Sequence, residues 1–464
     1  MNSIDLDQTA TSVRAATLDD LEATGALLRP GSEGYDAARA AWNLAVDLRP
    51  AAVAVPTSVE DVVAVVRAAA AAGLRVVTMS TGHGMGPLAE ASLDDVVLVR
   101  LIALTGTTVD PETRTARVLG GTQWGEVVTA ASAHGLTALH GSAPDVGVAG
   151  YVLGGGLSFF GRQHGIAANS VTAVEVVTAD GSVVRATADE QPDLFWAVRG
   201  GGGGVGVVVA LELALLPYAD VFAGMLLWDR ERAPEVVRAW TEWTRTAPES
   251  VTTSLRVMSF PPLPELPPFL SGRHVVVIDG AVLEDDDTAA AVLAPLRALE
   301  PEVDTFARIP SGQLLHVHMD PPAPVPAVSD HAVLGELDDD AVAAFLEQVG
   351  PGTTSGLMFA ELRHLGGALA RDAGAAGALR RFEGDYALYC IAVAPTPQAA
   401  VAGKAAAYQV VRAMARWSRV ALLPTFTEAR VDGSRFHDGE DWARLCEVRA
   451  ALDPQGTFTT GVGG

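Results

Sequence analysis

The chain has 464 residues, of which 49% are hydrophobic and 19% charged, and its formal net charge at pH 7 is −24. This length allows two or three domains with their own cores, and the charged fraction is too low for a disordered protein. The negative charge repels nucleic acid and anionic membrane surfaces, so we expect neither as a partner and favour a small neutral or cationic substrate.

The cysteine content and the apolar stretches bear on the compartment. Only Cys390 and Cys446 are present, which excludes a disulfide framework and a thiolate zinc cluster and fits a reducing environment. The first 16 residues lack the apolar core of a secretory signal, and the long apolar stretches are interrupted by glycine or charged residues. We therefore expect a cytoplasmic protein without a membrane span, and the sequence leaves its oligomeric state open.

The first predicted elements are a strand, a helix and a second strand. Residues 51–55 form an apolar run, the capping-box pattern of residues 57–60 begins a helix that should end at Gly73, and residues 74–79 form the second strand. This order predicts a right-handed parallel unit. The next segment, residues 79–86, has a single histidine, His83, among glycines, so we expect this loop at the sheet edge where ligands bind.

The rest of the first half is predicted to be β-rich with short helices, and Pro217 is expected to end it. The predicted elements are a strand at 115–119, a helix at 124–134, a hairpin of 174–177 and 183–186 around Asp180-Gly181, a helical turn at 193–198 and a β-rich run at 205–216.

Beyond residue 220 helical and β-like segments alternate, which indicates an α+β domain whose sheet is covered by helices on one face. The predicted segments are helices at 234–244, 288–299 and 341–349, strands at 274–278 and 386–394, and a final helix at 441–452 before the turn at 453–456.

Three glycine-rich elements lie in the first half, at 82–86, 147–161 and 200–206. Together they indicate backbone wrapped around an extended ligand with a pyrophosphate, whose charge is met by N–H donors. The chain has neither a Rossmann fingerprint nor a P-loop ending in Gly-Lys-Ser/Thr. We therefore expect a dinucleotide held in another fold.

Longer motifs occur in a fixed order: Trp42-Asn43, Ser80-Thr81-Gly82-His83-Gly84, Pro144-Asp145-Val146-Gly147, Leu153-Gly154-Gly155-Gly156, Asn169-Ser170-Val171, Asp193-Leu194-Phe195-Trp196 and Glu361-Leu362-Arg363-His364. By these motifs the chain resembles the FAD-linked oxidases of the vanillyl-alcohol oxidase and p-cresol methylhydroxylase (PCMH) superfamily, in the bacterial berberine-bridge-enzyme-like branch. The resemblance implies an α+β fold. Its parts are a leader (1–34), a two-subdomain PCMH-type FAD-binding domain (35–217), a substrate-binding domain with an antiparallel sheet covered by helices (218–422) and a return to the FAD-binding domain (423–464).

The resemblance implies that His83 is bonded covalently to the 8α-methyl carbon of FAD. A neutral imidazole nitrogen can attack the electrophilic form of the flavin, and the bond makes the flavin a stronger oxidant. A loop histidine that only hydrogen-bonds the backbone is the alternative. The other FAD-binding residues that the resemblance implies are Ser80, Thr81, Gly82, Gly84, Met85, Pro144, Asp145, Gly147, Val148, Gly150, Gly154, Gly155, Leu157, Asn169 and Val177.

The chain departs from the family in three places. Many relatives have a second covalent link to a cysteine where this chain has Ala143, so we expect a singly attached flavin. Gly204-Val205-Gly206 replaces the usual Asn-Phe-Gly, and residues 423–426 replace a Tyr-x-Asn pattern near the flavin. With these changes we still expect the chain to bind FAD, but we expect it to differ from the family in how the flavin packs and in its catalytic residues.

The candidate catalytic residues are Glu361, Arg363 and Tyr151. Strand alternation places Glu361 and Arg363 on one face, where they could act as a base or substrate anchor, or form a structural ion pair. Tyr151 could donate a hydrogen bond to charge on the reduced flavin or serve packing alone. A strand over 316–318 would place His316 and His318 on one face, but without a third ligand we expect no metal site.

These features predict a monocovalent FAD-dependent oxidase of a small molecule, which is expected to be a secondary metabolite. A base would take a proton from an O–H or N–H, a hydride would pass to flavin N5, and O2 would be the electron acceptor, with oxidative cyclisation as a related outcome. One alternative is a flavin-containing scaffold that acts as a redox-neutral cyclase or binding protein. Another is an NADPH-dependent reductase of related fold.

Overall fold

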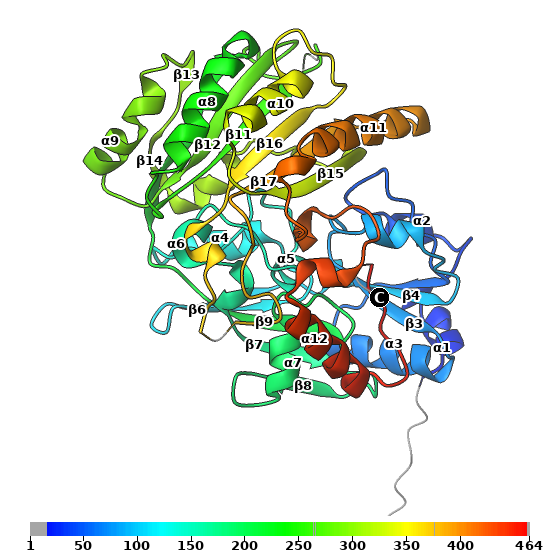
Figure 1. Ribbon diagram of the computed structural model, residues 1–464. Coiled ribbons are helices and arrows are strands. Elements are labelled where there is room, and N and C mark those ends of the chain that lie inside the picture. Colours follow the sequence, from blue (N-terminus) through cyan, green and yellow to red (C-terminus); the bar gives the residue numbers. More distant parts are fainter. Residues whose placement is uncertain (1–15, 263, 265, 375, 462–464) are drawn as a thin grey trace, which may run out of the picture.

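The computed structural model describes residues 16–262, 264, 266–374 and 376–461. These residues form three β-sheets, two in the first half of the chain and one in the second (Figure 1). Of the predicted leader, residues 1–15 lie outside the described residues, and residues 27–28 already form the edge strand of the first sheet.

The first sheet has four strands in the order β1-β2-β4-β3, and only β1 is antiparallel to its neighbour. The predicted strands β2 and β3 are not adjacent, because β4 lies between them and pairs in parallel with both. The elements are β1 (Leu27–Leu28), β2 (Ala52–Ala54), β3 (Arg75–Met79) and β4 (Val96–Arg100), with helices α1 (Leu18–Ala23), α2 (Tyr35–Arg39) and α3 (Val59–Ala71).

Helix α3 begins one residue later than the capping pattern predicted. The Ser58 hydroxyl accepts from the N–H of Asp61, and the Asp61 carboxylate accepts from the N–H of Ser58, so the box is formed by these two residues rather than by Thr57 and Glu60. The Thr57 N–H and hydroxyl also donate to Asp61. The predicted end is confirmed, since Gly73 has a φ of +68° directly after the last turn.

The second sheet is antiparallel and has five strands in the order β5-β6-β9-β7-β8. Apolar residues of these strands and of helices α4, α5 and α7 share one buried core. The elements are β5 (Thr107–Asp110), β6 (Thr115–Leu119), β7 (Val171–Val177), β8 (Val183–Ala186), β9 (Val207–Ala214), α4 (Trp124–Ser132), α5 (Val148–Leu153), α6 (Gly161–His164) and α7 (Pro192–Val198).

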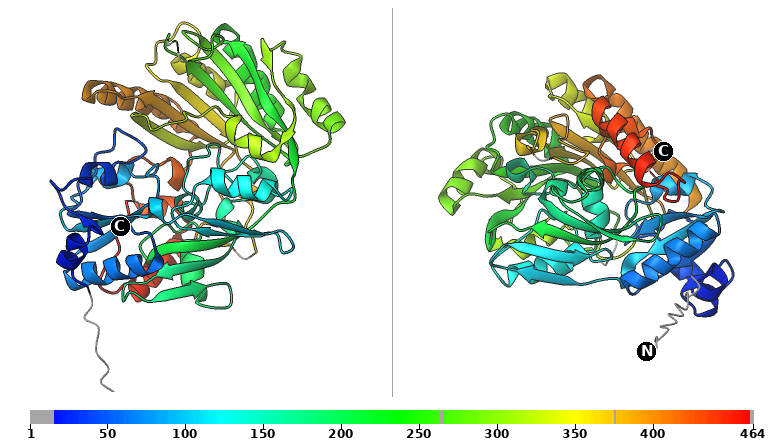
Figure 2. Two further views of the ribbon diagram at one scale, coloured as in Figure 1. Left: turned by 180° about the vertical axis from the view of Figure 1, so that it is seen from behind. Right: turned by 90° about the horizontal axis from the view of Figure 1, so that it is seen from below.

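The third sheet is antiparallel and has eight strands, in the order β13-β10-β12-β11-β16-β17-β15 with β14 beside β10. Helices α8 to α11 lie on its outer face, and the other face looks toward the first half of the chain (Figures 1 and 2). The elements are β10 (Asp220–Asp229), β11 (Val251–Ser259), β12 (His274–Val282), β13 (Val303–Asp304), β14 (Ala307–Pro310), β15 (Ala327–Leu334), β16 (Phe359–His364), β17 (Tyr386–Val393), α8 (Ala233–Thr244), α9 (Asp286–Arg297), α10 (Asp339–Val349) and α11 (Pro397–Ala413).

The C-terminal segment returns to the first half. Helix α12 (Gly439–Leu452) lies against α7, where Arg444 pairs with Asp193 at 2.9 Å and its guanidinium lies 4.1 Å from the Trp196 ring centroid. Further on, the backbone near Phe458 pairs with Val76 of β3. The return therefore closes the molecule over the loops that follow β3.

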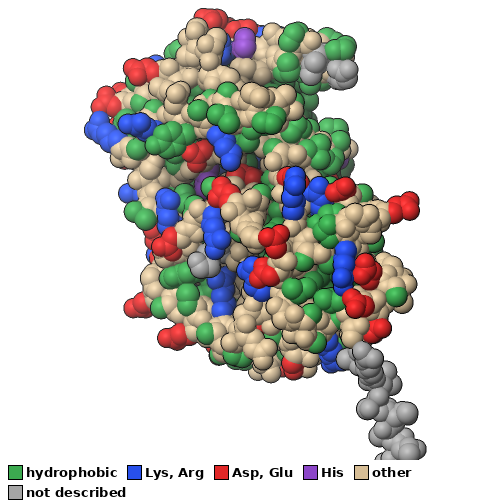
Figure 3. Space-filling view, turned by 90° about the vertical axis from the view of Figure 1, so that its right-hand side faces the viewer, with side chains coloured by type: hydrophobic (Ala, Val, Ile, Leu, Met, Phe, Trp, Pro, Cys, Tyr) green, Lys and Arg blue, Asp and Glu red, His purple; other side chains and the backbone are tan. Residues whose placement is uncertain are grey.

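Two other observations concern the surface and the membrane. Acidic and basic side chains are interspersed over the face in Figure 3, with no broad patch of one sign. None of the helices in the described ranges has the length and apolar character needed to cross a bilayer.

Candidate active site

A cavity of about 420 Å³ lies between the first half of the chain and the inner face of the eight-stranded sheet, within the usual size range of ligand pockets. The loop after β3, the start of α5 and the glycine run after α7 form one side. Strands β16 and β17 and the C-terminal return form the other. The predicted residues on its wall are Ser80, Thr81, Gly82, His83, Gly84, Met85, Gly147, Gly150, Tyr151, Gly154, Leu157 and Arg363.

The glycines of this wall have two different roles. Gly82 has a φ of +92°, and a Cβ there would lie 2.8 Å from the Cα of Ala41, so neither the conformation nor the packing admits a side chain. A Cβ on Gly147 would lie 2.6 Å from the Ser80 hydroxyl oxygen. Gly84 and Gly150 have no atom within 4 Å of such a Cβ and present bare backbone to the cavity. This is the cradle that an extended ligand requires.

His83 is held from three sides. Its ring stacks on the Trp42 indole with centroids 4.4 Å apart, its Nδ1 lies 2.8 Å from the Thr81 hydroxyl, and its Nε2 lies 3.8 Å from Oδ1 of Asp145. Burial lowers the pKa of His83 to about 4, although the charges of Asp145 and Asp320 oppose the shift. The imidazole is therefore neutral at pH 7, which is the form that acts as a nucleophile.

The remaining predicted FAD-binding residues do not line the cavity. Val148 and Val177 are buried in hydrophobic cores, Asn169 lies in the 3₁₀ turn Ala167–Ser170, Pro144 packs on Gly125, and Gly155 packs beside Leu379 and Ile166. Asp145 also lies outside the lining, but it contacts His83 and accepts a hydrogen bond from the Trp42 indole. These residues support the wall rather than form it.

The inner face of the eight-stranded sheet carries a buried group of charges, the sheet ion cluster, which consists of Arg256, Asp279, His318, Glu361 and Arg363. Arg256 is paired with Asp279, His318 Nδ1 lies 2.9 Å from Asp279 Oδ2, and Arg363 Nε donates to Glu361 Oε1 at 2.7 Å. Burial by itself would raise the pKa of Asp279, but the charges of Arg256 and His318 outweigh burial and hold this pKa far below its usual value. The pKa of Arg363 is raised: burial lowers it, but the carboxylate of Glu361 more than compensates.

Within this cluster Arg363 reaches the cavity and Glu361 does not. Glu361 is 0% exposed, whereas Arg363 is a lining residue whose guanidinium lies 5.2 Å from the Phe426 ring centroid. Residues 316–318 do not form the predicted strand: a 3₁₀ turn ends at His316, which is exposed, and His318 enters the ion cluster. Among the described residues no group of three or more His, Cys, Asp or Glu is arranged to hold a metal ion.

Tyr151 lies on the cavity wall with its ring edge-on to Trp124, at a centroid distance of 5.5 Å. Its hydroxyl is buried and has no hydrogen-bond partner among the described residues, and burial raises the pKa of the phenol. A buried hydroxyl left without a partner is costly in a native protein. This donor is therefore available to a ligand.

The sequence motifs did not indicate Glu428, which also lines the cavity. Within the part of the chain that the structure describes, its carboxylate forms no hydrogen bond or ion pair. Burial raises the pKa of Glu428 to about 7, against the opposing charge of Lys404 on α11. The only available signal was its place in the C-terminal return, two residues beyond the segment 423–426 that the resemblance sets near the flavin.

Asn43, in the first half of the chain, and Tyr389, in the second half, also line the cavity. Asn43 donates from Nδ2 to the carbonyl of Ala327 at 2.9 Å, and its Oδ1 accepts from the Ala327 N–H at 3.0 Å, so the first half is tied to β15. On β17, Tyr389 lines the cavity, while Tyr386 faces the helices and bonds the Thr244 hydroxyl at 2.6 Å. The strand alternation thus separates a cavity residue from a packing residue.

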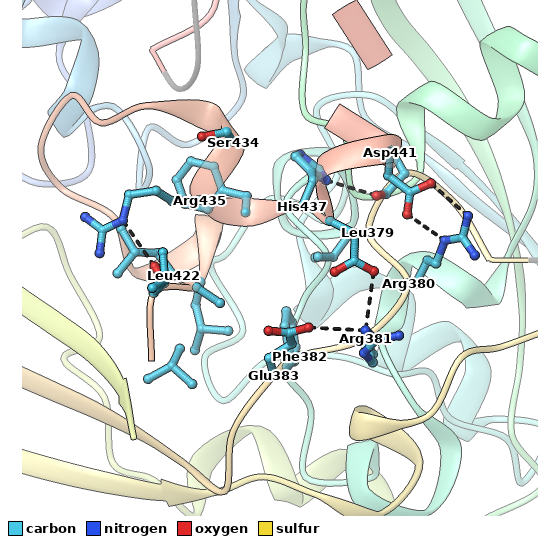
Figure 4. Close-up of a pocket in the computed structure, with 17 residues that line it drawn as sticks. Leu379, Arg380, Arg381, Phe382, Glu383, Leu422, Ser434, Arg435, His437 and Asp441 are labelled. Atoms are coloured by element: carbon cyan, nitrogen blue, oxygen red, sulfur yellow. Dashed lines mark hydrogen bonds and ion pairs between the residues drawn. The ribbon is translucent and has the colours of Figure 1, made fainter. Parts of the chain in front are cut away.

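A second cavity of about 130 Å³ lies beside α12, and Figure 4 shows its lining. Its charged side chains are already matched: Arg380 forms two hydrogen bonds with Asp441, and Arg381 pairs with Glu383 and Asp438. These ion pairs hold the return segment in place.

The larger cavity fits FAD. Bare glycine backbone, an unpartnered Tyr151 hydroxyl and a neutral His83 at the wall are what a flavin dinucleotide needs from the protein. Ala143 is buried at the position of a possible second link, and neither Cys390 nor Cys446 is among the lining residues.

Comparison with known proteins gives the class. Residues 50–187 match the family model of an FAD binding domain. Over 231 residues the chain is 33% identical to glucooligosaccharide oxidase of Sarocladium strictum, which covers 49% of this chain and 46% of that protein. Over 210 residues it is 35% identical to (R)-6-hydroxynicotine oxidase of Paenarthrobacter nicotinovorans, covering 45% of each. The match thus spans about half the length of these relatives.

The fold agrees over nearly the whole chain. A solved 6-hydroxy-D-nicotine oxidase from Arthrobacter nicotinovorans has a TM-score of 0.79 at 22% identity, covering 93% of this chain and 96% of that one. BBE-like 1 of Physcomitrella patens has a TM-score of 0.81 at 21% identity, covering 96% and 98%. The chain therefore contains an FAD-binding domain and has the fold of the berberine-bridge-enzyme-like proteins, as its motifs and the predicted fold class indicated.

Proposed function

We propose that this protein is an FAD-dependent oxidase of a small molecule, with FAD bonded covalently to His83, hydride transfer to flavin N5 and O2 as electron acceptor. The observation that carries the proposal is the cavity of about 420 Å³ that the loops of the FAD-binding domain share with polar side chains of the eight-stranded sheet. The flavin supplies the two-electron acceptor. The protein must hold the substrate, take up its proton and exclude water.

We assign the proton acceptor to Glu428 rather than Glu361. Glu428 faces the cavity, and a carboxyl with a pKa of about 7 is suited to accept a proton at neutral pH. Glu361 lies behind the wall and is paired with Arg363, so its role is to hold that guanidinium toward the cavity. Arg363 anchors the substrate, and Tyr151 donates a hydrogen bond to negative charge that develops during the reaction.

The substrate class is an alcohol, lactol or amine. The relatives named above act on oligosaccharides and on 6-hydroxynicotine, and Phe426, Tyr389 and Ile391 give the cavity an apolar side that suits a secondary metabolite. Ring closure after oxidation is a possible further step in the same cavity. The two free cysteines of the described residues support a cytoplasmic location.

Mass spectrometry of the acid-denatured protein tests the covalent bond. We expect the wild type to retain the mass of one FAD and His83→Ala to lose it. Free FAD released from the wild type would refute the covalent attachment.

Anaerobic mixing tests the oxidase activity. Cello-oligosaccharides and 6-hydroxynicotine serve as first probes, and a substrate that is consumed should bleach the visible flavin band. A substrate consumed without bleaching would indicate a redox-neutral cyclase, and bleaching by NADPH alone would indicate a reductase.

The pH dependence of the bleaching rate separates the two glutamates. In the wild type the rate should rise with pH through about 7, where Glu428 loses its proton. Glu428→Gln should remove this step and lower the rate about 100-fold or more, the usual contribution of a general base. Glu361→Gln, the matched control, should keep the step. If Glu361→Gln removed the step and Glu428→Gln kept it, Glu361 would be the proton acceptor.

A further inference from the structure

The environment of His83 contains an oxygen atom that the oxidase reaction does not use. Oδ1 of Asp145 is buried, has no hydrogen-bond partner among the described residues and lies 3.8 Å from Nε2 of His83. The other carboxylate oxygen, Oδ2, accepts from the Trp42 indole N–H, and the Trp42 ring stacks on the imidazole. Trp42 thus fixes the carboxylate and the imidazole relative to each other.

This arrangement selects one tautomer of the neutral imidazole. A carboxylate oxygen beside Nε2 favours the proton on that nitrogen, and the Thr81 hydroxyl, 2.8 Å from Nδ1, can donate to the lone pair that remains there. The nucleophilic lone pair is then on Nδ1, and the Thr81 hydroxyl has to turn away from it before the new bond forms. The proton that must leave when Nδ1 forms a bond faces Asp145.

We infer that Asp145 accepts the proton of His83 when the protein attaches its own flavin, and that Trp42 and Thr81 are positioning residues for this step. The inference rests on the covalent attachment proposed above and adds the residue that promotes it.

The overall step balances. One N–H bond of His83 and one C–H bond of the flavin 8α-methyl group are broken, and a bond between Nδ1 and the 8α-carbon is formed. The two protons and two electrons that are released reduce one molecule of O2 to H2O2. Asp145 receives the imidazole proton and passes it to solvent, so it is unchanged at the end.

A second carboxylate provides the matched control. Asp320 also acts electrostatically on His83, but its Oδ2 already accepts from the Ser142 hydroxyl at 2.7 Å. Asp145 and Asp320 both raise the pKa of the imidazole, against the larger opposing effect of burial. A general effect of negative charge would make both residues matter, whereas proton transfer requires only Asp145.

The test is the fraction of flavin that stays bonded after acid denaturation, followed in air at 25 °C with full-length protein that carries FAD. We expect Asp145→Asn to bind FAD and to form the adduct about 100-fold more slowly than the wild type, the usual effect of losing a general base. Its rate should rise with pH, because hydroxide can replace the carboxylate. Asp145→Glu and Asp320→Asn should form the adduct fully, and H2O2 should be released in equal amount.

Each other outcome contradicts one part of the inference: the proton transfer, the tautomer or the covalent attachment. A wild-type rate in Asp145→Asn, or an equal loss in Asp320→Asn, would overturn the proton transfer. An Asp145→Asn protein without any bound flavin would make Asp145 a binding residue and also overturn it. Attachment through Nε2, seen by NMR of the proteolytic flavin peptide, would contradict the tautomer. Absence of the adduct in the wild type would instead refute the covalent attachment itself.

Discussion

The two sides of the cavity differ in whether backbone or charged side chains form them. The FAD-binding side presents glycine backbone and one neutral histidine, whereas the sheet side presents arginine and carboxylate groups, most of them buried and paired. The first side depends on backbone conformation over short stretches of chain. The second depends on side chains brought together from separate strands. Damage to the first should therefore affect the cofactor, and damage to the second should affect the fold.

The largest effect is expected in the sheet ion cluster. Asp279→Asn leaves the buried Arg256 without its counter-charge, and removing one partner of a buried pair costs about 3–5 kcal/mol. Denaturant unfolding should show this loss. Glu175→Gln, which breaks the partly exposed pair with Arg117, should cost less than about 1 kcal/mol. Equal losses in the two variants would contradict the contrast between the sides.

Glu428 should make the stability of the protein depend on pH. Its pKa rises from 4.5 to about 7 on folding, so its contribution is complete below pH 4.5 and is lost as pH rises through 7. Relative to Glu428→Gln, the wild type should lose up to about 3 kcal/mol across this window, at 1.36 kcal/mol per pH unit. Melting temperatures of both proteins from pH 4.5 to 8 measure it. A constant difference would disprove the raised pKa.

On the FAD-binding side, two neighbouring glycines give a matched pair. Gly82→Ala forces a side chain into a left-handed conformation against Ala41 and should cost about 1–3 kcal/mol and weaken FAD retention. Gly84→Ala places its methyl group where no atom lies within 4 Å, so the fold should be unaffected. Thermal unfolding and the flavin content of the purified proteins distinguish them. The comparison would fail if Gly84→Ala were the more damaging change.

The smallest effect is expected for Cys446→Ser. This cysteine is exposed and is not among the lining residues, so stability should change by less than about 0.5 kcal/mol and the flavin adduct should be unchanged. Intact-mass measurement checks it. Loss of the adduct would contradict attachment through His83.

The sequence predicted most elements of the first half because their signals are local. The strand at 115–119, the turn at Asp180-Gly181, the end of helix α3 and the start of helix α4 depend on residues within a few positions of one another. The same holds for the loop of His83, where Gly82 has the left-handed conformation that the turn requires. The position of β4 between β2 and β3 was not predictable in this way, since parallel pairing depends on distant segments.

The sequence by itself thus predicted the fold class, the glycine-rich loops on the cavity wall and the histidine among them. Only the tertiary structure shows which carboxyl groups face the cavity and which are enclosed behind its wall. Glu361 does not face the cavity, because Arg363 and the neighbouring strands enclose its carboxylate. Glu428 does face the cavity, because the return segment folds back beside β17 and α11. The physical reason is that the pKa of a side chain depends on burial and on neighbouring charges, and these come from residues far apart in the sequence.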